Sequence, residues 1–281
     1  HVAALAGAGI VVAERTAEPT MFRALHIAQT GMSAQETHLE TISNNISNGN
    51  TVGYKKQRVD FQDLLYQTVR APGTPTGQNS TSPTGLQLGS GVRVVSTSRV
   101  FSQGSVLTTN NPLDVAIEGE GFFVVQQQDG TPAYTRAGAL RTDAEGKLVT
   151  PEGFALEPPI NIPEGAVSIS ISANGTAPVR SAVETTPSDV GQIQTAAFVN
   201  PAGLQSIGHN LLLPTAASGE AQVGEPGSDG RGALLQGATE QSNVDIVEEM
   251  IGLISAQRAY EINSKVITTA DEMLRAASQM R

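Results

Sequence analysis

The last forty residues constrain the fold more than any other stretch of the chain. No proline occurs from Ser242 to Met280, and apolar residues recur at helical spacing over about eight turns of about 3.6 residues, which places them on one face of an α-helix. This first row comprises Val244, Val247, Ile251, Ile254, Ile262, Val266 and Met273. A second row beside it comprises Ile246, Met250, Leu253, Tyr260, Ile267 and Leu274.

The two rows together are too wide for a helix with a single neighbour. At about 100° per residue they cover more than half of the circumference, whereas a helix on a globular core presents an apolar stripe about 100° wide. The remaining side carries small residues, which allow a neighbouring backbone to approach closely; these are Gly252, Ala256, Ala259, Ala270 and Ala277. We therefore expect this helix to have neighbours on several sides.

A second helical pattern begins at Met21. Its apolar positions alternate three and four apart, as in the seam of a coiled coil, with one interruption at Gln35. A coiled-coil seam at one end of the chain and a broad apolar helix at the other predict that the terminal helices pack together and associate with other copies. The predicted assembly residues are Leu25, Met32, Leu39, Ile42 and Ile46 in the first helix, and Val247, Met250, Ile251, Ile254, Tyr260, Ile262, Val266 and Met273 in the second.

The middle of the chain has the pattern of short strands. Val92–Val100 alternates in part between apolar and polar residues, and the Asp129-Gly130 pair is a strong hairpin signal between two apolar runs. Turn residues recur about every ten positions, without the rhythm of βαβ units. The predicted class is α+β: a discontinuous, coiled-coil-like helical domain from both termini, with an inserted, mainly antiparallel β domain.

The corresponding domain boundaries follow from changes in composition. Pro, Gly and Ser are concentrated in residues 71–85 and 216–230, as in linkers. The predicted segments are an atypical leader at 1–20, the N-terminal helix region at 21–55, an extended linker at 56–91, the β domain at 92–215, a linker at 216–241, and the C-terminal helix at 242–281.

The leader differs from the rest of the chain. Val2–Val12 is an apolar run of small residues, too short to span a bilayer and without the basic start of a signal peptide. We expect residues 1–20 to be poorly ordered, with Met21 as the natural first residue, and we expect no direct insertion into a membrane.

Composition and charge exclude several classes of function. The net charge is −10, whereas binding to nucleic acid requires clustered Lys and Arg; the densest group, Lys55, Lys56 and Arg58, is predicted to be a solvated turn. The chain has no cysteine, which removes disulfides, thiolate metal sites and thiol catalysis. Charged residues make up 16% of the chain against about 25% in typical domains, as suits a surface largely covered by protein.

No constellation of residues indicates catalysis or a bound cofactor. His26 and His38 lie twelve positions apart, too far for a metal pair on one helix. The Gly119-Glu120-Gly121 run does not lead into a helix, so it is predicted to be a turn rather than a phosphate loop. Ser242 and Asp245 are predicted to form a capping box at the start of the C-terminal helix. We therefore predict no catalytic, cofactor-binding or metal-binding residues.

The end of the first helix carries a motif. Asparagine and glycine in Ser43–Lys55 are suited to capping the helix and to turning the chain. The stretch also resembles the N-x-x-N-x-x-T-x-G-aromatic signature of bacterial flagellar basal-body rod and hook proteins, with Gly49 departing from the apolar residue often found there. The motif residues are Asn45, Asn48, Thr51, Gly53 and Tyr54.

Further segments extend the resemblance over Met21–Arg281. They are Phe61–Thr68, Gly85–Val92, Asp114–Phe123, Tyr134–Arg136 and, most specifically, Gln257–Lys265. Within the family the nearest resemblance is to the distal rod members, and the segment from Phe61 to about Gly85 is similar to the one that distinguishes the straight rod from the curved hook.

The resemblance implies a structural role rather than an enzymatic one. Such a subunit self-assembles through its terminal helices into a hollow helical filament in the distal rod, between periplasm and outer membrane, and transmits torque from motor to hook. Its implied partners are other copies of itself, other rod proteins, the hook protein, the P-ring and L-ring proteins, and the flagellar type III export apparatus, with no nucleic acid.

The residues alone leave a second class open, a soluble enzyme or carbohydrate-binding module in which the β domain acts and the helices only dimerise. A dimerisation helix needs one apolar seam, whereas a tube of subunits needs contacts on several faces. The width of the apolar surface on the C-terminal helix favours the structural subunit.

Overall fold

The computed structural model describes residues 20–73, 83–163, 165–181 and 188–279. Nearly all of the predicted leader, and part of the predicted linker at 56–91, lie outside these residues. The chain forms two compact units. The first unit comprises the chain up to Glu36, Phe61–Val94, and the chain from Gln257 onward; the second comprises Thr37–Asp60 and Val95–Ala256.

Two long helices lie at the ends of the chain, as the sequence predicts. Helix α1 is Thr20–Ser47 and helix α2 is Ile246–Gln279, and the strands between them are paired antiparallel wherever a register is given, for example between β7 (Phe122–Gln126) and β8 (Pro132–Thr135). The predicted α+β class with helices from both termini is therefore confirmed, while the coiled-coil character of the helices stays a prediction.

The start of α2 differs in detail from the predicted capping box. Asp245 is the N-cap, because its Oδ1 accepts hydrogen bonds from the backbone N–H groups of Val247 and Glu248 at 2.9 and 3.2 Å. Ser242 lies three residues too early to cap this helix, and its Oγ accepts from the N–H of Val244 at 3.3 Å. The prediction that Ser242 caps the helix is wrong.

Small residues mark the contact between the two helices within each unit. In the second unit, a Cβ added to Gly252 would lie 3.5 Å from Cδ1 of Ile42. In the first unit, a Cβ added to Gly31 would lie 2.9 Å from Nδ2 of Asn263. Ala256 and Ala270 are also buried. The small-residue side of α2 therefore faces α1, as expected for closely packed helices.

The main sheet belongs to the second unit and is organised around β7, whose first four residues are buried. One edge of β7 pairs with β8, and the other edge is shared by β15 at Phe122 and Phe123 and by β11 at Val125 and Gln126. The hairpin predicted at Asp129-Gly130 is confirmed as the turn between β7 and β8. The sheet also contains β9 (Arg141–Thr142), β10 (Leu148–Val149), β11 (Ala155–Leu156), β15 (Thr195–Ala197), β16 (Gln205–Gly208), β17 (Leu211–Leu213) and β18 (Gln222–Gly224).

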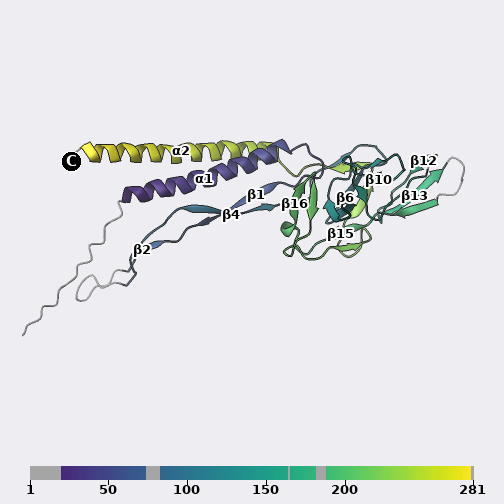
Figure 1. The fold of residues 1–281 in the computed structure, drawn as a ribbon, viewed down its shortest axis with the longest axis horizontal. Coiled ribbons are helices and arrows are strands. Elements are labelled where there is room, and N and C mark those ends of the chain that lie inside the picture. Colours follow the sequence, from purple (N-terminus) through teal and green to yellow (C-terminus); the bar gives the residue numbers. More distant parts are fainter. Residues whose placement is uncertain (1–19, 74–82, 164, 182–187, 280–281) are drawn as a thin grey trace, which may run out of the picture. The chain divides into compact units, whose positions relative to one another are not determined.

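The remaining strands form smaller sheets, and Figure 1 shows β12 and β13 side by side. A short 3₁₀ helix spans Pro201–Gly203. The pairs are β1 (Gln57–Asp63) with β4 (Val92–Arg99), β2 (Gln67–Arg70) with β3 (Leu86–Leu88), β6 (Val115–Glu118) with β19 (Ala233–Gln236), and β5 (Val106–Thr108) with β20 (Ala238–Glu240), and the sheet of three is β12 (Ala166–Ile169), β13 (Thr176–Ser181) and β14 (Ser188–Gln192).

Several of these strands lie in ranges where the sequence predicts linkers. Residues 216–241 contain β18, β19 and β20, and residues 56–91 contain β1, β2 and β3. For β19 and β20 the reason is that the partners are distant: Leu234 pairs with Ile117 and Thr239 with Leu107. Local Gly and Pro content predicts turns, but it does not reveal pairing across more than a hundred positions.

The core of the second unit is divided between the two faces of β7. Phe123 and Val125 belong to a mostly aliphatic cluster with Val115, Ile117, Leu140, Leu148, Ile160 and Ile193. Phe122 and Val124 belong to an aromatic cluster with Tyr134 and Phe198. The rings of Tyr134 and Phe198 meet edge to face, with centroids 4.8 Å apart, a favoured geometry for aromatic pairs. Adjacent side chains of β7 thus point into two separate cores.

Candidate functional site

The side of α2 that does not face α1 carries a set of large, exposed apolar side chains. We call this surface the apolar face of α2. Its largest exposed fractions are 67% at Val247, 65% at Ile251 and 64% at Ile262. Since burying one large aliphatic side chain stabilises a protein by about 1.5–3 kcal/mol, the face leaves substantial free energy unrealised in the single chain. Its members are Val247, Met250, Ile251, Ile254, Ile262, Val266 and Met273, and Tyr260 lies at its border with 37% exposure.

The predicted assembly residues of α1 are more enclosed. Ile42 is buried, and its Cδ1 lies against Gly252 of α2, so its side chain is covered within one chain. Leu25, Met32, Leu39 and Ile46 are half-buried. The contact with α2 thus covers Ile42 of the α1 seam, whereas the apolar face of α2 stays exposed.

Residues of both helices line a groove in the first unit. It has a volume of about 330 Å³ and an almost wholly apolar lining. Three members of the apolar face of α2 contribute to it, so part of this face is concave. The lining residues are Ala24, Ile262, Lys265, Val266, Thr269, Ala270 and Met273.

The structure brings the five motif residues together at the end of α1, within the second unit. Asn45 is 1% exposed. Its Nδ2 donates to the carbonyl of Gln57 at 2.9 Å, and its Oδ1 accepts from the N–H of Gln57 at 2.9 Å. The same Nδ2 donates to Glu249 Oε2 at 3.2 Å. One amide side chain therefore ties the end of α1 to the start of β1 and to the first turn of α2.

The other motif side chains close the turn that follows α1. Asn48 donates to the carbonyl of Asn44 at 2.9 Å, and Thr51 donates to Asn48 Oδ1 at 3.2 Å. Tyr54 is buried, its hydroxyl donates to Asn44 Oδ1 at 2.9 Å, and the guanidinium of Arg99 lies 5.6 Å from the centre of its ring. Burial raises the pKa of the Tyr54 hydroxyl. These contacts explain the motif by local structure.

Gly53 is the motif residue with the strictest backbone requirement. Its φ is +71°, and a Cβ would lie 2.6 Å from the backbone N of Ala137. Its N–H donates to the carbonyl of Glu240 at 2.8 Å. A side chain at this position would force apart two segments of backbone, which is why the motif needs glycine here.

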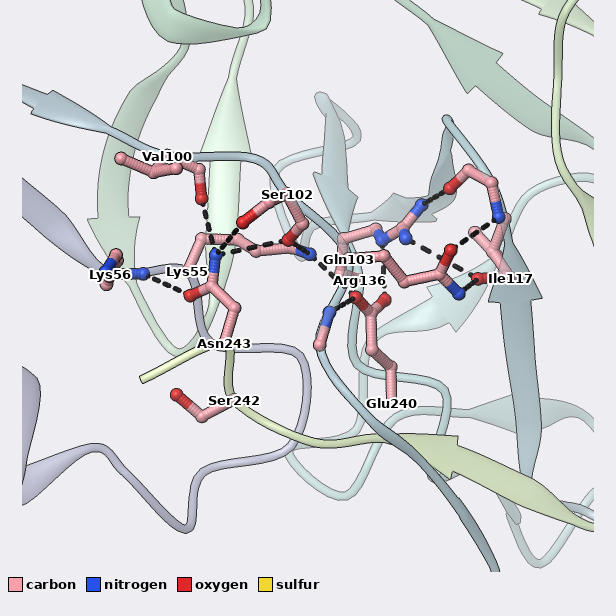
Figure 2. A network of polar contacts seen from close by, with 12 residues as sticks. Lys55, Lys56, Val100, Ser102, Gln103, Ile117, Arg136, Glu240, Ser242 and Asn243 are labelled. Atoms are coloured by element: carbon pink, nitrogen blue, oxygen red, sulfur yellow. Dashed lines mark hydrogen bonds and ion pairs between the residues drawn. The ribbon is translucent and has the colours of Figure 1, made fainter. Parts of the chain in front are cut away.

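Glu240 is the centre of a buried ion network (Figure 2). Its carboxylate contacts Lys55 Nζ at 2.6 Å and Arg136 Nε at 2.8 Å, and it accepts from the N–H of Gly104 at 2.9 Å. All three charged side chains are at most 5% exposed. Arg136 also donates to the carbonyls of Gly119 and Gly121 at 2.9 and 2.7 Å. The network joins the turn after α1 with β8 and β20.

The pKa values of the network follow from burial and from the partner charges. Burial alone would raise the pKa of the Glu240 carboxyl, but Arg136, Lys55 and the N–H of Gly104 together hold it below its ordinary value. Burial lowers the pKa of the Lys55 amine, and the ion pair with Glu240 offsets part of this effect. Glu240 is therefore held as a carboxylate by its neighbours.

Asn243, a few residues after Glu240 in the sequence, makes a second set of contacts between distant segments (Figure 2). Its Oδ1 accepts from the N–H of Lys56 at 2.7 Å, and its Nδ2 donates to the carbonyls of Val100 and Ser102 at 2.8 and 3.1 Å. The segment that leads into α2 is thus held to the start of β1 and the end of β4.

The sequence reasoning missed most of this network. Lys55 is not part of a solvated turn, since it is 3% exposed and ion-paired, so that interpretation is wrong. Arg136 lies in one of the segments that carry the family resemblance, but its role was not predicted. Glu240 and Asn243 gave no local signal, because their partners lie more than a hundred positions away in the sequence.

A hollow lined by aromatic rings in the second unit is small. It has a volume of about 60 Å³, well below the roughly 300–1,000 Å³ of typical ligand sites, so it offers little to a carbohydrate-binding reading. It is lined by Phe101, Phe122 and Phe198 together with Lys55 and Arg136. Over the described ranges, no group of His, Asp and Glu side chains is arranged to hold a metal ion. Neither described helix has the length and hydropathy to cross a membrane.

We expect Gly53→Ala to destabilise the second unit strongly, because it combines a disfavoured positive φ with a backbone clash. Gly130→Ala is the matched control: φ is +82° there, but no atom lies within 4 Å of the added Cβ. Gly130→Ala should lower the free energy of unfolding by about 1–2 kcal/mol, because alanine disfavours the left-handed conformation. Gly53→Ala should lower it clearly more. Urea unfolding of both variants tests this, and equal losses would contradict the clash.

Glu240→Gln should cost about 3–5 kcal/mol in free energy of unfolding, because Lys55 and Arg136 stay buried without their counter-charge. Glu145→Gln is the matched control, since Glu145 contacts Lys147 at a similar 2.9 Å but on the surface. We expect no measurable change there. Similar losses in the two variants, measured by urea unfolding, would refute a special role for the buried network.

The stabilisation that Glu240 provides should also depend on pH. The pKa of Glu240 is lower in the folded chain than its ordinary value of 4.5, so the stabilisation is complete above about pH 4.5 and is lost as pH falls through the folded-state pKa. The difference in free energy of unfolding between the unmodified chain and Glu240→Gln should therefore shrink from pH 7 towards about pH 3. A constant or growing difference would contradict this assignment.

Comparisons with known proteins agree with the resemblance in the sequence. Family models match at residues 25–55 (flagella basal body rod protein), 116–179 (flagellar hook protein FlgE/F/G D1 domain) and 235–280 (flagellar basal body rod FlgEFG protein C-terminal). The chain is 50% identical to the flagellar basal-body rod protein FlgG of Caulobacter vibrioides over 92% of this chain and 99% of that protein.

Two further relatives carry the same name. The FlgG protein of Borreliella burgdorferi is 48% identical over 93% of this chain and 99% of its own length. The FlgG protein of Bacillus subtilis is 40% identical over 90% of this chain and 97% of its own length. The chain therefore belongs to the FlgG family of flagellar basal-body rod proteins, and it is a structural, non-enzymatic component of the rod of the flagellar basal body.

Proposed function

We propose that copies of this chain associate through the apolar face of α2, with support from α1, and build the distal part of the rod. The contacts would be heterologous, joining different surfaces of neighbouring copies. When the rotation between such copies does not close, the product is an open helical filament rather than a ring. In this arrangement the terminal helices line a hollow tube, and the β-rich parts form an outer layer.

The exposure of the apolar face of α2 is the observation that supports this proposal. Seven large apolar residues, from Val247 to Met273, remain between 42% and 67% exposed in the single chain. Isolated exposed apolar residues are common, but seven on one side of a single helix indicate an interaction surface. A second copy, rather than a small ligand, is the kind of partner that can cover a row of this length.

The role of such a filament is mechanical. As a component of the basal body, the chain assembles with other basal-body and hook components. We propose more specifically that its neighbours are other rod proteins on one side and the hook protein on the other, with P-ring and L-ring proteins around it. Torque would pass along the filament from motor to hook, and subunits would reach it through the flagellar export apparatus.

Replacing Ile251 and Ile254 by Asp should abolish assembly. Each carboxylate would enter a dry interface, at a cost of several kcal/mol, whereas in the single chain these positions are 65% and 48% exposed. The folded monomer should therefore keep its thermal midpoint. Electron microscopy and sedimentation of the concentrated protein would show rods for the unmodified chain and monomers for the variant.

A matched pair of variants separates the interface from a general effect of charge. Val247→Asp changes the apolar face of α2 at a residue that is 67% exposed, and Val199→Asp makes the same change at a residue in a loop of the second unit that is 81% exposed. Only Val247→Asp should reduce assembly. Rods that form normally from Val247→Asp and from the double variant would refute the proposed interface.

A further inference from the structure

Strand β5 offers an unpaired edge. Among the described residues it pairs only with β20, with Val106 opposite Glu240 and Thr108 opposite Ala238. The flanking hydrogen bonds run from Gln241 N–H to the Ser105 carbonyl and from Thr109 N–H to the Gly237 carbonyl. Because hydrogen-bonded pairs alternate along an antiparallel ladder, the N–H and C=O groups of Val106 and Thr108 point away from β20.

The edge is apolar and unprotected. Val106 is 39% and Leu107 is 53% exposed, and no charged residue occurs from Phe101 to Pro112. Proteins usually protect an exposed edge with charged residues, proline or a bulge. The edge strand β9 of the main sheet follows this rule, since Arg141 and Asp143 flank its Thr142. Strand β5 is short, with three residues, but carries no such charge, so its edge is open to another chain.

The charge distribution indicates which chain this is. The second unit carries 20 acidic and nine basic residues, so two copies of it have the same net negative charge and repel each other. A basic partner would favour that acidic surface, whereas a second copy, with the same negative charge, is accommodated best where charge is absent. The uncharged stretch Phe101–Pro112 is such a place.

The edge is also continuous with the proposed assembly surface. An open groove of about 530 Å³ is lined by Ser102–Ser105, which lead into β5, and by Ser242–Val247, which lead into α2. Val247 belongs to the apolar face of α2, and Ile246 beside it is 40% exposed. One neighbouring copy can therefore contact the helix, the groove and the strand edge together.

We propose that a segment of a second copy pairs with the free edge of β5, so that main-chain hydrogen bonds to Val106 and Thr108 add to the helix contacts. The inference rests on the proposed self-assembly of this chain and extends it from the helices to the β-rich unit. Edge pairing gives affinity through the backbone and fixes register, in contrast to a sliding apolar contact.

Thr108→Pro tests the edge directly. Its N–H points away from β20, so proline removes a bond to the neighbour and leaves the pairing with β20 intact. Thr142→Pro is the matched control, an exposed threonine on the edge strand β9. The backbone N–H of Asp143 donates to the carbonyl of Lys147 in the adjacent turn, so the N–H of Thr142 likewise points outward.

We expect Thr108→Pro to raise the lowest concentration that yields rods at least tenfold, and Thr142→Pro to leave it unchanged. The thermal midpoint of monomeric Thr108→Pro should match that of the unmodified chain. Thr108→Pro rods at the unmodified concentration would overturn the inference. If Ile251→Asp blocks assembly while Thr108→Pro does not, the proposed function stands and only the edge contact fails. If the unmodified chain forms no rods, both fail.

A crosslinking experiment covers the case in which proline disturbs the fold. The chain has no cysteine, so Thr108→Cys can be labelled at one site with a thiol-reactive photocrosslinker. In assembled rods, illumination should give covalent dimers from Thr108→Cys and none from Thr142→Cys. Dimers from neither variant, or equally from both, would contradict edge pairing.

Discussion

The buried carboxylate of Glu240 is the interaction on which the rest of the second unit depends. Two cations, Lys55 and Arg136, share it at 2.6 and 2.8 Å with almost no access to solvent. Removing charges from water is costly unless their hydrogen bonds are complete, and here backbone carbonyls at Ser102, Gly119 and Gly121 complete them. The turn after α1, the strand β8 and the end of β20 are therefore fixed by a single side chain.

The motif at the end of α1 and the Glu240 network act as one joint. Asn45 binds Gln57 and Glu249, and the N–H of Gly53 binds the carbonyl of Glu240 itself. The polar groups of this joint are satisfied within a single chain, whereas the apolar face of α2 is not covered by it. Different residues thus fix the fold and offer contacts to a neighbour. The joint fixes where α2 begins, and the side chains exposed beyond it are available to a neighbouring copy.

The elements that the sequence predicts well are those with a local signal. The period of apolar residues predicts both helices, the small residues of α2 predict the side that faces α1, and Asp129-Gly130 predicts the hairpin of β7 and β8. Strands β19 and β20 were not predicted, because their partners β6 and β5 are distant in sequence. The contacts of Glu240 and Asn243 were not predicted for the same reason. Lys55 was predicted to be solvated because a basic cluster in the sequence gives no sign of a buried partner.

The two uncovered surfaces, the apolar face of α2 and the edge of β5, offer a neighbour different kinds of contact. A helix satisfies its own backbone, so α2 can present only side chains to a neighbour, and its contacts tolerate small displacements. An edge strand presents N–H and C=O groups at fixed intervals, so a contact at β5 specifies register as well as proximity. A chain with net charge −10 cannot rely on general attraction between copies. In the proposed assembly, apolar area on α2 would supply the driving force for association, and the uncharged edge of β5 would supply its geometry.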